Sequence, residues 1–398
     1  MTIEFSKRCQ RTRPSAIRAL FKKCVDPEII SLGGGSPAKE GFPVAEFQDI
    51  VKHIVDEKPV DMLIYGLTPG YKPLREAYLK WIVEPKGVKA SLENVICFTG
   101  SGQGIDLTCE ILLDEGDVVF VESPTFLGSL NVLLKRGVNV VPIPTDDHGL
   151  MVEELEKKAK ELHPKMLYTI PSFQNPAGVT IPADRRQRIA ELAAEYNFIV
   201  LEDDPYGDVR FRGEKVPPIK LFDKADKVIM MNSFSKTLAP GIRVGACVAP
   251  VEIAQKLEVI KQGCDTHSST LPQAIVAEFL NRGLMDAHLK KIAPIYAERH
   301  DALVAGIRKY FPAECKFVEA EGGMFIWLKL PNHMDAKALA ETCIEKYKVA
   351  FVHGEPFCVN PEDGFDYIRL NFSGTPAEKI TIACERIGRA IKEQMAAK

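Results

Sequence analysis

Short apolar runs alternate with helical patterns through the middle of the chain. Ile189, Leu192, Ala193 and Tyr196 recur at helical spacing, which predicts an amphipathic helix over residues 183–196. Strands that alternate with helices predict an α/β fold with a mostly parallel, doubly wound sheet. The runs are almost continuously apolar, as strands covered on both faces are, and they lie at residues 94–99, 117–122, 138–143, 165–170, 198–203, 227–232 and 245–249.

After about residue 285 the pattern changes. Three β-rich stretches, at residues 322–330, 349–354 and 367–373, indicate a smaller α+β unit. A chain of 398 residues is also too long for one small core. We therefore predict a large domain over residues 51–285 with a mixed, mostly parallel sheet, and a small α+β domain over residues 286–398. Residues 1–50 are expected to pack with the small domain.

The composition is that of an ordinary soluble globular protein, with 46% hydrophobic residues, 26% charged residues and a net charge of −3. No excess of positive charge points to nucleic acid or an anionic membrane as a partner. The N-terminus has no apolar signal core, and no run approaches transmembrane length. The ten cysteines include no Cys-x-x-Cys pair, which favours reduced thiols in a cytoplasmic protein.

A glycine-rich turn, "TGSGQGID" at residues 99–106, follows a predicted strand and opens a helix. Free backbone N–H groups and the helix dipole make such an N-terminus suitable for an anion. The spacing differs from the dinucleotide fingerprint, but Glu122 lies 20 residues beyond Gly102, where an NAD site has its acidic ribose ligand. A phosphate site, a dinucleotide site and a ligand-free turn all fit this segment.

The stretch "SFSKTLAPGIRVG" at residues 233–245 collects polar side chains directly after a strand. Ser233, Ser235 and Arg243 offer two hydroxyls and a bidentate guanidinium, which suit a phosphate group. The cationic neighbourhood is expected to lower the pKa of Lys236 and favour its free amine, as a Schiff-base lysine requires. Taken alone, the stretch also fits a polar loop with a solvated lysine.

Two further polar segments end predicted strands. Asn175, in "YTIPSFQNPAG", precedes a proline and is therefore extended. In "LEDDPYGD", strand alternation puts Asp203 and Asp204 on opposite faces, so one carboxylate would face a ligand. The lack of a nearby histidine argues against a metal. Together the segments fit one ligand with a phosphate, an aldehyde, a basic ring nitrogen and a flat ring, and pyridoxal 5'-phosphate has all four.

With these residues in place, the chain resembles the fold-type I, pyridoxal-phosphate-dependent aminotransferases of class I/II. It is most similar to the branch of 2-aminoadipate, kynurenine and aromatic amino-acid aminotransferases. The motifs that carry the resemblance occur in family order between residues 31 and 373, and they are "SLGGGSP", "YGLTPGYKPLREA", "TGSGQGID", "ESPTF", "YTIPSFQNPAG", "LEDDPY", "SFSKTLAPGIRVG" and "YIRLNFS".

The resemblance implies roles around the cofactor. Lys236 would hold it as a Schiff base and then shuttle a proton, and Asp203 would pair with the pyridinium nitrogen and keep it protonated. Asn175 and Tyr206 would hydrogen-bond the 3-oxygen of the ring. Phe126 would stack on the ring, where many relatives carry tyrosine. The phosphate contacts would come from Ser101, Gly102, Gln103, Ser233, Ser235 and Arg243.

The resemblance also implies substrate and subunit contacts. Arg369 would clamp the α-carboxylate of the substrate bidentately, with Gly35 and Asn175 close to it. Arg18 resembles an arginine that meets a side-chain carboxylate or moves aside for an aromatic ring, although a surface helix arginine fits it equally well. Tyr65 would reach the phosphate of a neighbouring subunit, which implies a homodimer with active sites at the subunit interface.

One position departs from the family pattern, because His353 stands where relatives usually have proline; we assign it no role and treat it as a loop variant. The predicted function is transfer of an amino group from an amino acid to a 2-oxo acid such as 2-oxoglutarate by a ping-pong mechanism. The donor would be aromatic, 2-aminoadipate-like or one of a broad range.

Three other functions remain open. A pyridoxal-phosphate lyase or decarboxylase of the same fold shares the cofactor chemistry. An NAD-dependent oxidoreductase would use the glycine turn and Glu122, but it leaves Lys236 and Asn175 unexplained. A ligand-sensing regulator of this fold carries an N-terminal DNA-binding domain, whereas only some 50 residues precede the core here, with a net charge of only +2.

Overall fold

The computed structural model describes residues 3–12, 14–24 and 26–396. Its largest sheet has eight strands in the order β2-β9-β8-β7-β6-β3-β4-β5. The strands β8, β7, β6, β3 and β4 run parallel, while β9 lies antiparallel between β2 and β8. The predicted α/β fold is confirmed. The strands are β2 (Val95–Phe98), β3 (Val118–Ser123), β4 (Asn139–Asp146), β5 (Gly149–Leu150), β6 (Met166–Thr169), β7 (Ile199–Asp204), β8 (Val228–Ser233) and β9 (Gly245–Val248).

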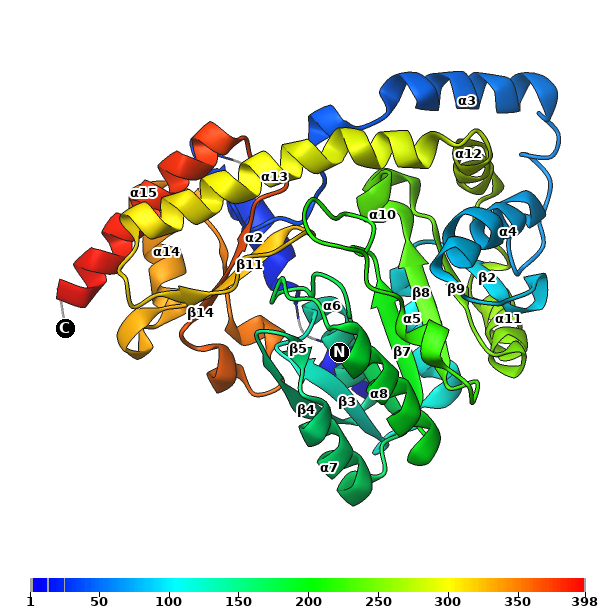
Figure 1. Ribbon diagram of the computed structural model, residues 1–398, viewed down its shortest axis with the longest axis horizontal. Helices are drawn as coiled ribbons and strands as arrows, with labels where there is room; N and C mark the ends of the chain where they lie inside the picture. The colour runs from blue at the N-terminus through cyan, green and yellow to red at the C-terminus, as the bar shows by residue number, and fades with distance from the viewer. Residues whose placement is uncertain (1–2, 13, 25, 397–398) are drawn as a thin grey trace.

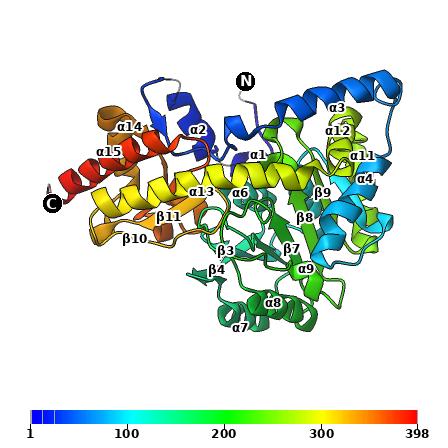
Figure 2. The same ribbon diagram turned by 45° about the horizontal axis from the view of Figure 1, so that its top comes forward.

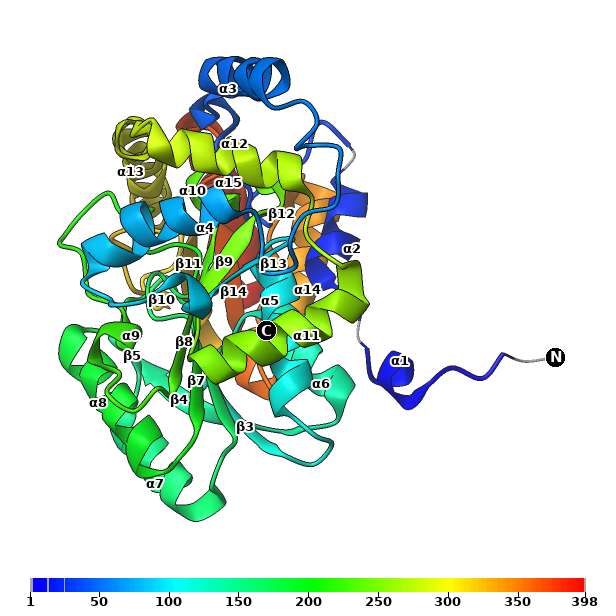
Figure 3. The same ribbon diagram turned by 90° about the vertical axis from the view of Figure 1, so that its right-hand side faces the viewer.

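Helices cover both faces of this sheet, which explains why β2, β6, β8 and β9 are buried along their whole length. Figure 3 shows the sheet nearly edge-on, with α7 and α8 on one side and α5, α6 and α11 on the other. The amphipathic helix predicted over residues 183–196 is α8. These helices are α5 (Ser101–Leu112), α6 (Leu127–Arg136), α7 (Val152–Leu162), α8 (Ala183–Glu195) and α11 (Val251–Asp265).

The C-terminal part contains a four-stranded antiparallel sheet of order β10-β11-β14-β13. The long helix α13 runs from beside α12 to lie along α15 (Figures 1 and 2), so it connects the two parts. The elements are β10 (Lys316–Phe317), β11 (Phe325–Lys329), β13 (Val352–His353), β14 (Tyr367–Asn371), α12 (Thr270–Asn281), α13 (Leu284–Tyr310), α14 (Ala336–Tyr347) and α15 (Ala377–Ala396).

The strand expected over residues 322–330 begins only at Phe325. The cause is a tight turn in which Gly323 has φ +68°, and in which a Cβ on Gly322 would lie 2.3 Å from the ring of Phe173. Gly322 is therefore required because the ring of Phe173 approaches its backbone, and Gly323 because of its positive φ.

The N-terminal segment joins the C-terminal part through a short parallel pair, in which β1 (Ile30–Ser31) meets β12 (Val349–Ala350). The domain boundaries expected at residues 50 and 285 stay predictions. Among the described residues, no helix combines the length and apolar character needed to cross a bilayer. The remaining helices are α1 (Lys7–Arg11), α2 (Ala16–Lys23), α3 (Val44–Glu57), α4 (Lys72–Tyr78), α9 (Ile219–Phe222) and α10 (Phe234–Thr237).

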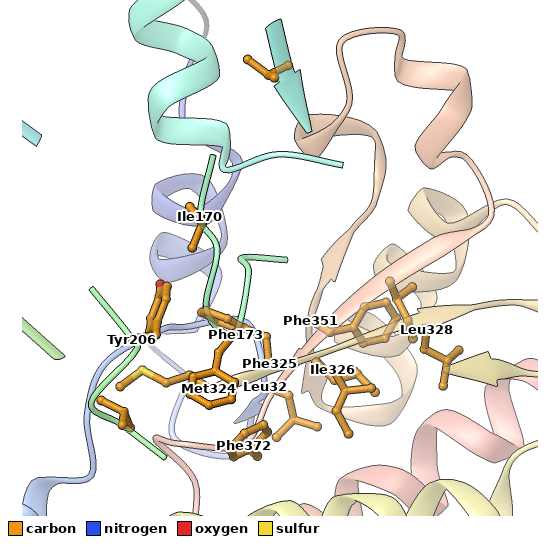
Figure 4. Packing of buried hydrophobic residues seen from close by; sticks show 14 of the residues in the cluster. Leu32, Ile170, Phe173, Tyr206, Met324, Phe325, Ile326, Leu328, Phe351 and Phe372 are labelled. Atoms are coloured by element: carbon orange, nitrogen blue, oxygen red, sulfur yellow. The ribbon is translucent and has the colours of Figure 1, made fainter. Parts of the chain in front are cut away.

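A buried apolar cluster joins the loops at the edge of the large sheet to β11 and the N-terminal segment (Figure 4). The ring of Tyr206 meets that of Phe325 edge to face, with centroids 6.0 Å apart. Leu32, Phe173 and Phe372 belong to the same cluster. This apolar packing lies beneath the polar residues described in the next subsection and supports them.

Candidate active site

Polar side chains from three parallel strands meet at one edge of the large sheet. Asn175 follows β6, Asp203 lies near the end of β7, and Lys236 lies on α10 directly after β8. The carboxyl ends of parallel strands share one edge, where open α/β sheets bind their ligands. The structure thus brings together the residues that the sequence singled out in separate segments.

Lys236 points at the N-terminal segment, and its Nζ donates to the backbone oxygen of Gly35 at 2.6 Å. Burial lowers the pKa of Lys236 to about 8, and the charges of Arg369 and Arg243 add to this effect. The predicted direction is confirmed, but burial is a larger cause than the cationic neighbours considered from the sequence. The side chain therefore becomes a free amine at a lower pH than an ordinary lysine does.

Asp203 is almost fully buried, with 3% of its surface exposed. The hydroxyl of Tyr168 donates to its Oδ2 at 2.8 Å, whereas its buried Oδ1 has no partner among the described residues. Burial raises the pKa of Asp203 to about 7. Asp204 turns to the other side, as predicted, and accepts from the backbone N–H of Gly207. An unpaired buried carboxylate oxygen calls for a donor, and a protonated ring nitrogen supplies one.

The C-terminal part contributes Arg369, on β14, to the site. Its Nη1 donates to Asn175 Oδ1 at 2.9 Å and its Nη2 to the backbone oxygen of Gly33 at 2.7 Å. The guanidinium carbon lies 4.2 Å from the ring centroid of Phe325 and 4.9 Å from that of Phe357. Burial lowers its pKa to about 9. A guanidinium held this firmly is preorganised to grip a carboxylate.

Tyr206 completes a hydrogen-bonded row with these residues. The Nδ2 of Asn175 donates to the Tyr206 hydroxyl at 3.3 Å, and both side chains are buried. The Asn175–Pro176 peptide bond is cis. Two polar groups thus converge where a ring oxygen could accept or donate a hydrogen bond.

A cradle for an anion forms between the start of α5 and the stretch after β8. Arg243 donates from Nη1 to Ser235 Oγ at 3.1 Å and from Nη2 to the backbone oxygen of Thr99 at 3.3 Å. Arg243 has φ +50°, a left-handed conformation that non-glycine residues rarely adopt. Gly100 has φ +79°, and a Cβ there would lie 2.2 Å from Arg243 Nη2. A guanidinium facing a helix N-terminus is well suited to phosphate.

The other expected phosphate ligands lie around this cradle. Ser101 and Gly102 form the first turn of α5, and Ser233 caps α10 by accepting from the N–H of Ser235. The side chain of Gln103 is already engaged, because its Oε1 accepts from Thr99 N and its Nε2 donates to Asp265 Oδ2. Gln103 thus shapes the turn from behind.

Two residues expected near the ring and the substrate lie in tight surroundings. Phe126 is half-buried at the start of α6. A Cβ on Gly35 would lie 3.0 Å from the ring of Phe325, so a larger residue there would press on the aromatic floor of the site.

Three singled-out residues form no hydrogen bond with the groups described above. Tyr65 is 87% exposed, and its ring meets that of His267 edge to face. Arg18 is exposed on α2, and its side chain forms no ion pair within the described residues. His353 on β13 lies beside Glu355, with 3.5 Å between Nδ1 and Oε2, and burial lowers its pKa. The structure gives His353 no catalytic contact.

The structure does not favour the dinucleotide alternative. Glu122 is fully buried and accepts from the backbone N–H of Ile170 at 2.9 Å, so no ribose can reach it. Burial raises its pKa to about 8. Its neighbour Gln174 donates to the backbone oxygen of Pro124 at 2.7 Å. Glu122, Gln174 and Tyr168 support the site. The sequence singled out Glu122 only as a candidate ribose ligand, and contacts in three dimensions reveal the supporting role of all three.

Known proteins of one family are similar to this chain along nearly all of its length. Residues 27–387 match the family model described as aminotransferase class I and II. The chain is 39% identical to aromatic-amino-acid aminotransferase 1 of Thermococcus litoralis, over 98% of this chain and 94% of that protein. It superposes with a TM-score of 0.94 and 38% identity on Pyrococcus horikoshii kynurenine aminotransferase in complex with PMP, covering 98% of this chain and 97% of the other.

A third similar protein is the α-aminoadipate aminotransferase of Thermus thermophilus, solved in complex with N-(5'-phosphopyridoxyl)-L-leucine. The TM-score is 0.90 with 35% identity, and the alignment covers 99% of this chain and 98% of the other.

Proposed function

Since the chain belongs to the aminotransferases of class I and II, we propose that it moves the amino group of an amino acid to a 2-oxo acid such as 2-oxoglutarate by a ping-pong mechanism. One observation carries the proposal: Lys236, whose pKa burial lowers to about 8, shares a strand-edge site with Asp203, whose buried Oδ1 has no protein donor. A lyase or decarboxylase of the same fold is not favoured, because the family model over residues 27–387 is that of aminotransferases.

The residues present fit pyridoxal 5'-phosphate. Its ring nitrogen would satisfy the unpaired Oδ1 of Asp203, and its phosphate would lie between Arg243 and the first turn of α5. When bound, this group supplies a carbonyl for an amine and a ring that accepts electrons. Two of the similar solved proteins hold PMP or a phosphopyridoxyl compound.

Each site residue then has a definite task. Lys236 would hold the cofactor through its amine and would move a proton once that amine is free. Asp203 keeps the ring nitrogen protonated, with Tyr168 fixing its other oxygen. Asn175 and Tyr206 orient the ring through its 3-oxygen, and Arg369 binds the substrate α-carboxylate. Ring stacking falls to Phe126, and phosphate contacts fall to Ser101, Gly102, Ser233, Ser235 and Arg243, while Gln103 supports the turn through Thr99 and Asp265.

The similar proteins act on aromatic amino acids, KYN or α-aminoadipate by their names, so we propose an aromatic, 2-aminoadipate-like or broad donor range. The exposed position of Arg18 on α2 leaves it free to approach a substrate side chain. A panel of amino acids assayed against 2-oxoglutarate measures the donor range. In Arg18→Ala, acidic donors should lose more kcat/KM than aromatic ones, and equal losses would reject a role for Arg18.

We also propose a homodimer whose subunits complete each other's phosphate cradle. Apolar side chains are exposed together on the segment between α3 and α4, and a contiguous apolar patch is typical of a protein interface. These side chains are Val60, Leu63, Ile64, Tyr65 and Leu67. Arg243 and Gly102 are likewise exposed in one subunit, so the cradle has room for Tyr65 of a second copy. All ten cysteines are free thiols, which supports a reducing compartment such as the cytoplasm.

Borohydride trapping tests the proposed function. The purified protein should show a visible absorbance band that an amino acid bleaches and a 2-oxo acid restores, and borohydride should fix the cofactor's mass on the peptide that contains Lys236. Lys236→Ala should lose trapping and about a hundred- to ten-thousandfold of the turnover rate, as loss of a proton-transfer group does.

Lys227→Ala is the matched control, because Lys227 binds Asn197 at the surface. It should behave like the wild type. Wild-type turnover in Lys236→Ala, or trapping on another lysine, would reject the assignment.

A further inference from the structure

A second buried lysine lies behind the phosphate cradle. Lys261, on α11, has 0% of its surface exposed. Its Nζ donates to Asp265 Oδ1 at 2.6 Å and to Ser268 Oγ at 3.0 Å. Lysine is almost never fully buried unless it is paired, because desolvating an ammonium is costly. No part of the proposed reaction uses Lys261, so its position requires another explanation.

The first branch from Lys261 runs through Asp265 to the cradle. The other carboxylate oxygen of Asp265 accepts from Gln103 Nε2 at 2.7 Å. The Oε1 of Gln103 in turn accepts from the backbone N–H of Thr99 at 2.8 Å. An unbroken chain of hydrogen bonds therefore connects the ammonium to the residue that precedes Gly100.

The second branch runs through Ser268 and ends at the same residue. The hydroxyl of Thr99 donates to Ser268 Oγ at 3.1 Å, and the backbone oxygen of Thr99 accepts from Arg243 Nη2 at 3.3 Å. Thr99 is thus held through its N–H, its hydroxyl and its carbonyl. The backbone conformation of Thr99 determines the direction of the N–H groups that follow it at the start of α5. The two branches therefore fix the direction in which these N–H groups point.

We propose that Lys261 is a positioning residue for phosphate binding: by fixing Asp265 and Ser268 it holds Thr99, and with it aims the N–H groups of Ser101 and Gly102 at a phosphate ester. This inference rests on the proposed function, since the phosphate is that of the cofactor. Lys261 does not touch the ligand. Its effect is specific to the phosphate, whereas a purely structural ion pair would affect the stability of the fold alone.

The test compares two aldehydes that differ only in the phosphate. Dissociation constants of pyridoxal 5'-phosphate and pyridoxal are measured for the full-length protein stripped of cofactor, as wild type and as Lys261→Met. The variant should bind the phosphorylated aldehyde about tenfold more weakly, which corresponds to loss of roughly one charge-assisted hydrogen bond. Its affinity for pyridoxal should stay unchanged, so the ratio of the dissociation constant of pyridoxal 5'-phosphate to that of pyridoxal should rise about tenfold.

Lys220→Met is the matched control. The side chain of Lys220 has only 8% of its surface exposed and is likewise paired with an aspartate close along the chain, Asp223, at 2.8 Å, but Lys220 lies on α9. Its loss should lower the melting temperature and leave the ratio of constants as in the wild type. Asp265→Asn is a second variant that breaks the same chain of hydrogen bonds at a partly exposed side chain. It should shift the ratio in the same direction, and it replaces Lys261→Met in the test if that variant does not fold.

Three results would overturn the inference. Wild-type affinity for pyridoxal 5'-phosphate in Lys261→Met, or in Asp265→Asn where only that variant folds, would reject the role of Lys261. Equal weakening of both aldehydes would show a general disturbance of the site. A wild-type protein with no preference for the phosphorylated aldehyde would reject the proposed cofactor site itself, and the wild-type measurement alone identifies that case.

Discussion

Lys236 takes its reactivity mainly from burial, and this has a measurable consequence. Because burial and two nearby arginines disfavour the ammonium form, the pKa falls to about 8, below the value of about 10.4 for a free lysine. The neutral amine therefore predominates above about pH 8. We expect the rate of cofactor attachment to the stripped enzyme, followed by absorbance, to rise with pH and level off just above pH 8.

Two variants test the cause. Arg369→Met removes the second contribution to the lowered pKa, so the midpoint should move upward. Arg188→Gln removes a surface arginine of α8 that pairs with Glu156 and should leave the midpoint in place. A wild-type midpoint near pH 10 would contradict the proposed state of Lys236.

At the scale of single residues, the sequence indicates which groups carry chemistry but not how their surroundings tune them. Asp203 was recognisable from its place at a strand end. The hydrogen bond from Tyr168, 35 positions earlier, follows from the parallel pairing of β6 with β7. Gln103 was expected beside the phosphate, yet its amide is engaged by Thr99 and Asp265. Spacing along the chain cannot reveal partners that only folding brings into contact.

The loop after β3, which carries Phe126, and the loop after β6, which carries Asn175, are joined by the side chain of Gln174. Gln174 donates to the backbone oxygen of Pro124, and its Oε1 accepts from the N–H of Ala177 at 2.8 Å. Gln174→Met leaves both groups without this partner, which should destabilise the protein by about 1–3 kcal/mol. Displacement of the ring-binding residues should also lower kcat/KM by roughly a hundredfold.

Gln187→Met is the control for this prediction. Gln187 lies exposed on α8 and donates to Glu191 at 2.9 Å, so its loss should change neither quantity measurably. Kinetics are measured well below the melting temperature of both variants. If Gln174→Met loses stability but keeps its kcat/KM, then the loops are positioned by other contacts.

For the elements themselves, an apolar run reveals burial but not the neighbouring strand. The strand positions and α8 follow from the sequence to within a few residues, because covered strands are nearly all apolar. The sequence does not indicate that β9 lies antiparallel between β2 and β8. The stretch at 349–354, expected as one strand, is divided between β12, which pairs with β1, and β13, which pairs with β14. Pairing is decided by contacts distant in sequence.

Across the whole molecule, the site is complete only where both parts and the N-terminal segment meet. Arg369 comes from the C-terminal sheet, Asn175 from the loop after β6 and Gly33 from the segment before α3, and Arg369 donates hydrogen bonds to both of the others. The order of motifs in the sequence indicates the family but not this convergence. One expected contributor, Tyr65, faces away from its own chain's packed core and into solvent.

Subunit complementation decides whether Tyr65 acts on the neighbouring site. Tyr65→Ala and Lys236→Ala are each expected to have little activity alone. If Tyr65 serves its partner, a mixed dimer contains one site with both residues intact, because Lys236 comes from one chain and Tyr65 from the other. Random exchange of subunits makes half of the dimers mixed, so an equimolar mixture should regain about a quarter of wild-type activity. If Tyr65 served its own subunit, neither site of a mixed dimer would be intact, and the mixture would stay as inactive as its components.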